Sequence, residues 1–303
     1  IFFDGRGGPP ARGGGKTHRF YASQSEKIAN YAIQLTIQGQ TITSKYGTKE
    51  HFIHHCEQLL TAGLSHSLFE KENTISKEAR QTIERLAELG YKKYIALKGH
   101  KMFVPYLENK STLKYYGQAN IGSRPDKRGN KKQLDLEDLR AIPFVGSWSQ
   151  LKQNVPGYFG IGTAIQTLIN EGKLDDLKNL FKKVPFFKAL ILNSMMSLSK
   201  CYFELTRYIA EDEAYKEFWN ILCDEYRLSK EMVLKISGYK QLMEEESVTR
   251  HSIEIRERIV LPLLTIQQYA LQKIEQDAGN KDVYEKIVRR SLYGNINASR
   301  NSA

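Results

Sequence analysis

The chain has 303 residues, 41% of them hydrophobic, and a formal net charge of +11 at pH 7. That length predicts about two ordinary domains or one barrel-sized unit. The sequence contains no run of about 18 apolar residues, so it predicts no transmembrane helix. The positive charge favours anionic partners: nucleic acid, acidic lipid or phosphorylated small molecules. Composition does not choose among them.

A glycine-rich segment lies near the start of the chain. Residues 1–4 (IFFD) predict the end of a buried strand, and GRGGPPARGGGKTH follows over residues 5–18. Its glycines let the loop move and let backbone N–H groups approach an anion. Arg6 and Arg12 add guanidinium groups suited to phosphate or carboxylate. Because substrates of α/β barrels bind at strand ends, the segment predicts an anion-binding loop.

Two other interpretations of this segment compete with an anion-binding loop. A P-loop needs a glycine where this chain has Pro10, although GKT follows. An RGG-type RNA-binding segment is usually long, repetitive and disordered, whereas this one has two copies beside a predicted strand. A basic helical module that binds RNA through this loop stays open as an alternative function.

The next 100 residues predict mostly helix. Residues 34–46 alternate apolar and polar side chains around a glycine, which predicts a small hairpin. Helical periodicity starts at Thr48, and a second helix follows Ser76, a plausible N-cap. Residues 107–133 are polar, basic and glycine-bearing, and predict a long loop.

The second half is dominated by predicted helices. AIPFVGSW at 141–148 is a short apolar run that predicts a buried strand. Nearly everything after Gly157 predicts helix, including a long helix near 186–210 and amphipathic helices up to about Tyr293. The predicted class is α/β and strongly helix-dominated.

Several residues resemble metal or dinucleotide sites, but we expect an ordinary structural role for them. His51, His54 and His55 have helical spacing for a metal, but without an HExxH motif we expect a partly exposed helix face. Three glycines resemble a dinucleotide fingerprint only in reverse order: Gly157, Gly160 and Gly162. We expect them to permit close helix packing.

The chain has three cysteines, Cys56, Cys201 and Cys223. They form no CxxC pair, which favours a reducing cytoplasm.

Two ordered segments carry a family resemblance. FFDGRGGPPARGGGKTH and IGSRPDKRGNKKQLDLEDLRAIPFVGSWSQ resemble successive signatures of the phosphoenolpyruvate carboxylases, in the carboxyl-terminal part of the bacterial-type family. The resemblance implies the later strands of a TIM-type β/α barrel embedded in many helices. Residues 1–165 would be the barrel-derived part, with the catalytic loop at 5–18 and an arginine-bearing strand and loop at 121–148. Residues 166–303 would be the helical effector-binding part.

The resemblance also implies an activity: carboxylation of phosphoenolpyruvate by bicarbonate to oxaloacetate and phosphate, through carboxyphosphate and an enolate, with Mg²⁺ or Mn²⁺. The metal ligands and the general-base histidine of the family lie upstream of the matching region. We therefore assign no metal ligand to this chain and expect it alone to be inactive. The implied catalytic residues are Arg6, Arg12 and Arg140, and the implied substrate-binding residues are Gly7, Gly8, Gly13, Gly14 and Arg124.

Three later segments match an effector site of the family. PFFKALILNSMMSLSK places Lys200, SIEIRERIVLPL places Arg256, and the final NINASRNSA places Asn301. With Arg12, these residues would hold aspartate or malate as an inhibitor, which would draw Arg12 away from the active site. Without the resemblance, Lys200 and Arg256 would be ordinary surface charges. The preference between the two acids stays open.

Other implications are a cytoplasmic homotetramer with no nucleic-acid or membrane partner. The chain departs from the family pattern at Asp4, at Pro9 and Pro10, and at Ala303. These departures leave a catalytically degenerate, carboxylase-like protein as an alternative. Because residue 1 is isoleucine and a motif starts there, we also expect the chain to be part of a longer polypeptide.

Overall fold

The computed structural model describes residues 16–23, 35, 37, 40–68, 75–116, 139–276 and 279–299. These residues form helices and contain no β-strand. The helix-dominated prediction is therefore confirmed for them, and they include no strand of a barrel. None of the described helices is long and apolar enough to cross a membrane. The elements are α1 (Thr17–Ala22), α2 (Gln40–Tyr46), α3 (Lys49–Leu68), α4 (Lys77–Lys98), α5 (Phe103–Lys110), α6 (Leu113–Tyr116), α7 (Ala141–Gln150), η3 (Val155–Gly157), α8 (Ile161–Asn170), α9 (Leu174–Lys183), α10 (Pro185–Ser199), η4 (Phe203–Glu211), α11 (Lys216–Ser237), α12 (Ser247–Glu275) and α13 (Lys281–Ser299).

Aromatic side chains form the centre of the first core cluster. Trp148 of α7 is fully buried, and its ring centroid lies 5.8 Å from that of Phe103 and 6.1 Å from that of Tyr106, both on α5. Phe218 of α11 completes the group at 5.0 Å from Tyr106. Burial of such large rings is a main source of folding free energy. The cluster fixes the position of α7.

The second core cluster joins α8, α9, α10 and α11. A Cβ added to Gly162 at the start of α8 would overlap the backbone of Ser229 on α11. The backbone N–H of Gly162 donates to the hydroxyl of Ser229 at 3.1 Å, and that of Gly160 donates to the buried carboxylate of Glu225 at 3.2 Å. The glycines therefore allow close helix packing, as predicted.

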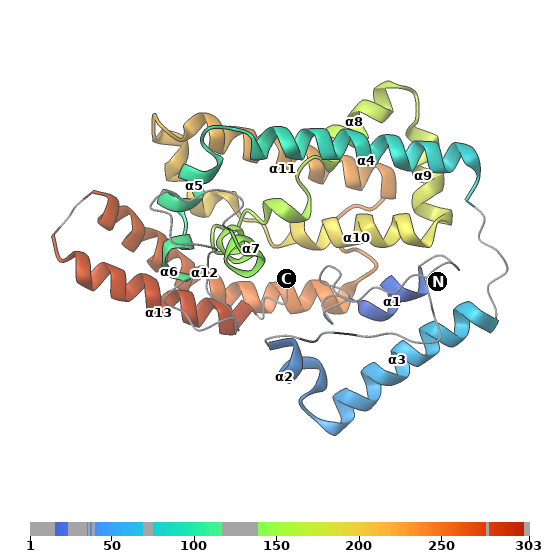
Figure 1. Ribbon diagram of the computed structural model, residues 1–303, viewed down its shortest axis with the longest axis horizontal. Coiled ribbons are helices and arrows are strands. Elements are labelled where there is room, and N and C mark those ends of the chain that lie inside the picture. Colours follow the sequence, from blue (N-terminus) through green and yellow to red (C-terminus); the bar gives the residue numbers. More distant parts are fainter. Residues whose placement is uncertain are drawn as a thin grey trace.

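Long helices define the arrangement in space. Figure 1 shows α4, α10 and α11 running along one another in the upper part of the molecule. Helices α12 and α13 lie side by side as an antiparallel pair at the lower left. This pair brings the last described residues back beside the middle of the chain.

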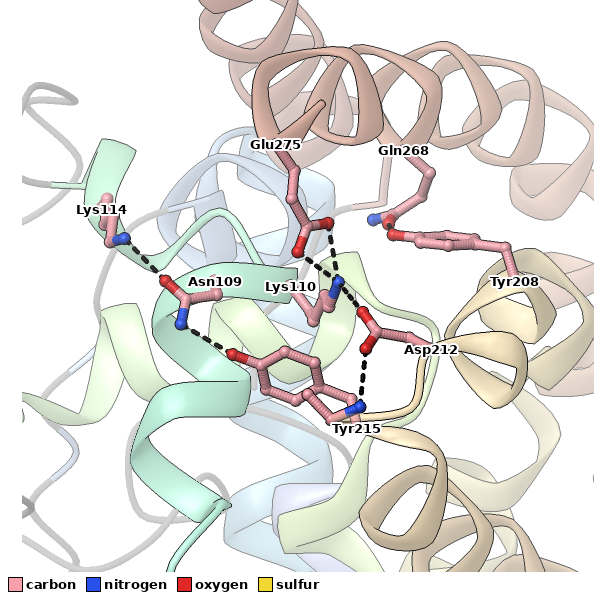
Figure 2. Close-up of polar contacts among 9 residues, drawn as sticks. Asn109, Lys110, Lys114, Tyr208, Asp212, Tyr215, Gln268 and Glu275 are labelled. Atoms are coloured by element: carbon pink, nitrogen blue, oxygen red, sulfur yellow. Dashed lines mark hydrogen bonds and ion pairs between the residues drawn. The ribbon is translucent and has the colours of Figure 1, made fainter. Parts of the chain in front are cut away.

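A buried lysine ties α12 to the first core cluster (Figure 2). Lys110 at the end of α5 is 2% exposed, and its Nζ donates to Asp212 Oδ2 at 2.6 Å. The same nitrogen donates to Glu275, the last residue of α12, and lies 4.7 Å from the ring centroid of Tyr215. One cation thus connects α5, the segment after η4 and the end of α12.

The sequence predicted a helix cap at Ser76 and a strand over residues 141–148. The N-cap at Ser76 is confirmed, because its hydroxyl accepts from the backbone N–H of Ala79 at 3.2 Å. The strand predicted over 141–148 is wrong, because these residues belong to α7. Pro143 is compatible with this helix, because it lies in the first turn, where a helix needs no N–H donor, whereas a central strand would lose a ladder hydrogen bond.

Three further predictions need correction. The long loop predicted over 107–133 begins too early, because residues 107–110 belong to α5 and residues 113–116 form α6. The second arm of the hairpin over 34–46 is wrong, because residues 40–46 form α2, which packs on α3 through the ring of Tyr46. Tertiary contact overrides the strand propensity of these residues. The long helix near 186–210 is broken after α10: residues 200–202 lie outside it, and η4 follows.

Candidate anion-binding site

The break after α10 forms one wall of a hollow between α7, α10, α12 and α13. The hollow has about 430 Å³ of empty space, including the open solvent at its mouth. Charged and polar side chains dominate its lining, which consists of Ser149, Gln150, Lys152, Lys200, Ile253, Arg256, Glu257, Val260, Leu264, Asn295 and Ser299.

Backbone contacts hold two lysines at this hollow. Lys152 follows α7 with a φ of 56°, in the left-handed region that non-glycine residues seldom adopt. Its carbonyl accepts from the backbone N–H of Tyr202 at 2.8 Å, which joins the loop after α7 to the break after α10. Lys200 is the C-cap of α10 at that break. The interruption of the helix therefore places Lys200 beside Lys152.

The hollow is electropositive. Burial lowers the pKa of Lys200 to about 8, and the nearby charges of Lys152 and Arg256 act in the same direction. Lys152 is almost fully buried and pairs with Glu257 of α12, with 2.6 Å between Nζ and Oε1. Three cations thus face one carboxylate, so an added anion would stabilise the charged form of Lys200.

Uncharged polar atoms complete the lining. Asn295 of α13 is 1% exposed, and its Nδ2 donates to Oε1 of Gln150 at 3.4 Å. Its Oδ1 and the hydroxyl of Ser299 are buried without a hydrogen-bond partner among the described residues. Buried polar atoms normally have partners, so these two are hydrogen-bonding groups in the wall of the hollow that no described residue uses.

Arg140 lies apart from this hollow, at the N-cap of α7 in an extended conformation with φ of −96° and ψ of 149°. Its Nε is buried and has no hydrogen-bond partner within the described part of the chain. The side chain of this N-cap residue makes no capping hydrogen bond to the first turn of α7. A guanidinium group beside the positive end of a helix dipole favours an anion there.

Comparison with known proteins identifies the family. The family model described as phosphoenolpyruvate carboxylase matches residues 1–299. The chain belongs to the phosphoenolpyruvate carboxylase family. It is similar to the phosphoenolpyruvate carboxylase of Corynebacterium glutamicum, with 32% identity over 99% of this chain and 34% of the relative. That of Thermosynechococcus vestitus is 31% identical over 96% of this chain and 30% of the relative. The chain therefore spans about a third of the length of these relatives.

Within this family assignment, the structure brings together two of the predicted effector residues. Lys200 and Arg256 line the same hollow. Lys152, Glu257 and Asn295 also line it, and the sequence predicted none of these three. No local signal pointed to them, because each lies in an ordinary helical or loop context. Predicted residues outside the described part are Arg6, Gly7, Gly8, Arg12, Gly13, Gly14, Arg124 and Asn301.

The end of the glycine-rich segment that falls within the described residues contacts α12. Lys16 and Arg19 both pair with the carboxylate of Glu246, which is 7% exposed and is the N-cap of α12. Arg256 follows on the same helix, about 15 Å further along its axis. Helix α12 therefore connects the end of this segment with the hollow.

The metal implied for this family has no matching ligand set in the described part of the chain. Among those residues, no three His, Cys, Asp or Glu side chains gather in an arrangement that could hold a metal ion. His54 and His55 are neighbours on α3, with ring centroids 5.3 Å apart, but no third ligand joins them there. No chemical step is therefore assigned to a metal on these residues.

Proposed function

We propose that the polypeptide containing this chain carboxylates phosphoenolpyruvate with bicarbonate, giving oxaloacetate and phosphate. Family membership over residues 1–299 is the observation that carries the proposal. Relatives that carry the name phosphoenolpyruvate carboxylase support it, although the chain spans only about a third of their length. The complete activity therefore needs residues beyond these 303, and we expect this chain alone to be inactive.

Arg140 is proposed to bind the phosphate or the enolate that develops during the reaction. Its position at the first turn of α7 supports this role, as does its buried Nε without a partner among the described residues. Preorganised cations stabilise negative charge that grows in a transition state. Arg6 and Arg12 would close over the same anions, and Arg124 with Gly7, Gly8, Gly13 and Gly14 would help to bind substrate.

The hollow is proposed as a regulatory site for a four-carbon dicarboxylate such as aspartate or malate. Lys200 and Arg256 come from separate elements and line one space, as two carboxylates require. Ser299 lines the same space and stands two residues before Asn301. Arg12 would complete the site, and the acid would inhibit by holding Arg12 away from the reacting centre.

The test is bicarbonate-dependent oxaloacetate formation from phosphoenolpyruvate with Mg²⁺, using the longest native polypeptide that contains this chain. Arg140→Ala should lower kcat by roughly 100-fold or more while the protein stays folded. Arg85→Ala is the matched control, because Arg85 forms exposed ion pairs with Glu88 and Glu171. A folded, metal-loaded protein without activity would overturn the carboxylase proposal and favour a degenerate, carboxylase-like protein.

Assembly and location are part of the same proposal. The resemblance implies a homotetramer in the cytoplasm. Sedimentation of the same native polypeptide would test the assembly, and a monomer at working concentration would contradict it.

A further inference from the structure

Glu257 is the only carboxylate among the described residues that line the hollow. It lies next to Arg256 on α12, and both residues line the same space. A carboxylate in a pocket for anions is unfavourable for binding them, since like charges repel. Its presence therefore bears on which anion the hollow accepts.

The geometry of Glu257 leaves part of its acceptor capacity available. Its Oε1 accepts from Lys152 at 2.6 Å, while the side chain of Glu257 is 23% exposed. An ionised carboxylate has about four lone-pair sites on two oxygens, so one such bond does not saturate it. A positively charged N–H group on a ligand could use the remaining sites.

A second acceptor lies in the same wall. The Oδ1 of Asn295 is buried, and no donor reaches it within the described part of the chain. Leaving a buried acceptor unsatisfied is costly, so a ligand donor there would be stabilising. The hollow therefore offers cations for carboxylates and also two acceptors that suit an ammonium group.

We propose that Glu257 makes this hollow selective for a four-carbon diacid that carries an α-ammonium over one that lacks it. The inference rests on the proposed regulatory site. At neutral pH an amino diacid carries one net negative charge, and its hydroxy counterpart carries two. Glu257 repels the hydroxy diacid more strongly, and only the amino diacid supplies a charged N–H donor to Glu257 and Asn295.

Calorimetric titration of the longest native polypeptide with L-aspartate and with L-malate tests the inference. Wild type should bind aspartate more tightly. In Glu257→Gln the ratio of the malate Kd to the aspartate Kd should fall by roughly tenfold, because one charge-assisted hydrogen bond and one repulsion are lost. Gln retains an acceptor for Lys152, which limits damage to the fold.

Two variants of Glu257 that match in size and differ in charge separate the effect of charge from an effect on the fold. Glu257→Asp keeps the negative charge and should keep the preference for aspartate. Glu257→Asn has a side chain of the same length as Asp but no charge, and it should lose the preference. This pair tests the inference even if Glu257→Gln fails to fold. Glu254→Gln is the control on the same helix, since Glu254 is 56% exposed and does not line the hollow.

Different results would contradict the regulatory site and the selectivity role of Glu257. If both acids bind wild type and the ratio is the same in Glu257→Gln, the selectivity role is wrong and the regulatory site stands. If neither acid binds the folded wild type, the regulatory site is wrong and the selectivity inference falls with it. Oxaloacetate formation, measured separately, decides the carboxylase activity in either case.

Discussion

The ammonium nitrogen of Lys110 lies 2.5 Å and 2.7 Å from the two carboxylate oxygens of Glu275, which is 165 residues further along the chain. Asp212 accepts from the same nitrogen (Figure 2). Burial alone lowers the pKa of Lys110, but the hydrogen bonds to Asp212 and Glu275 outweigh it and the pKa is raised. The charged lysine is thus stabilised at the contact that holds the end of α12.

Lys110→Met should destabilise the protein by about 2 kcal/mol, because it leaves two carboxylates facing each other without their shared cation. Both carboxylates are partly exposed, which keeps the loss below that of a fully buried pair. Urea unfolding measures the change. Lys216→Met removes an exposed pair with Glu213 and should cost less than about 0.5 kcal/mol. Equal losses in the two variants would contradict this role of Lys110.

Asp212 should make stability depend on acidic pH. Burial alone raises its pKa, but hydrogen bonds from Lys110 and from the backbone of Ala214 outweigh it and hold the pKa below 3.8. A lowered folded-state pKa stabilises the fold above the unfolded value, and this stability is lost as pH falls below about 3.8.

The difference in unfolding free energy between wild type and Asp212→Asn should therefore be about 1 kcal/mol at neutral pH and should shrink towards about pH 3. Asp224→Asn is the control, because Asp224 is 74% exposed and its pair with Arg227 is long, at 3.9 Å. A difference for Asp212→Asn that stays constant over this pH range would show that its charge does not contribute.

Binding of a dicarboxylate should weaken as pH rises through the pKa of Lys200, which is about 8. The neutral amine cannot pair with a carboxylate, so the Kd should rise roughly tenfold between about pH 7 and about pH 9. Lys152, Arg256 and Glu257 face Lys200, and the neighbouring thiol of Cys201 has its pKa raised to about 12 by burial.

Calorimetric titration with aspartate, in the longest native polypeptide, measures this dependence. Lys200→Met should bind more weakly throughout and should lose the change in this pH window. If the variant retained the wild-type pH profile, another group would be responsible. The same lowered pKa predicts that the free energy of unfolding rises from about pH 8 towards 10.5, because the unfolded chain binds the proton more tightly.

Two glycine-to-alanine changes should have opposite effects. Gly162→Ala places a methyl group into the backbone of Ser229 and should cost about 1–3 kcal/mol or more. Gly294→Ala in α13 meets only Cδ1 of Leu263 at 3.5 Å, and should be neutral or stabilise by up to about 1 kcal/mol. Thermal unfolding of both variants measures the contrast. A stable Gly162→Ala would mean that α8 and α11 separate readily.

The sequence by itself was sufficient for features that depend on short-range patterns. Ordered motifs identified the family, and a serine before a helical period located the cap at Ser76. Closely spaced glycines predicted close helix packing, and the structure shows it where Gly162 of α8 meets the backbone of Ser229 on α11. Each of these features depends on a few neighbouring residues, whose backbone preferences act locally.

Tertiary structure decided what those patterns leave open. Residues 141–148 are helical because α7 buries Trp148 among rings of α5 and α11, and a short apolar run has no period that distinguishes strand from helix. At the break after α10, the backbone N–H of Tyr202 donates to the carbonyl of Lys152, which is 50 residues earlier in the chain. Glu257 reaches Lys152 across 105 residues of sequence, so the charge balance of the hollow arises only when separate helices pack together.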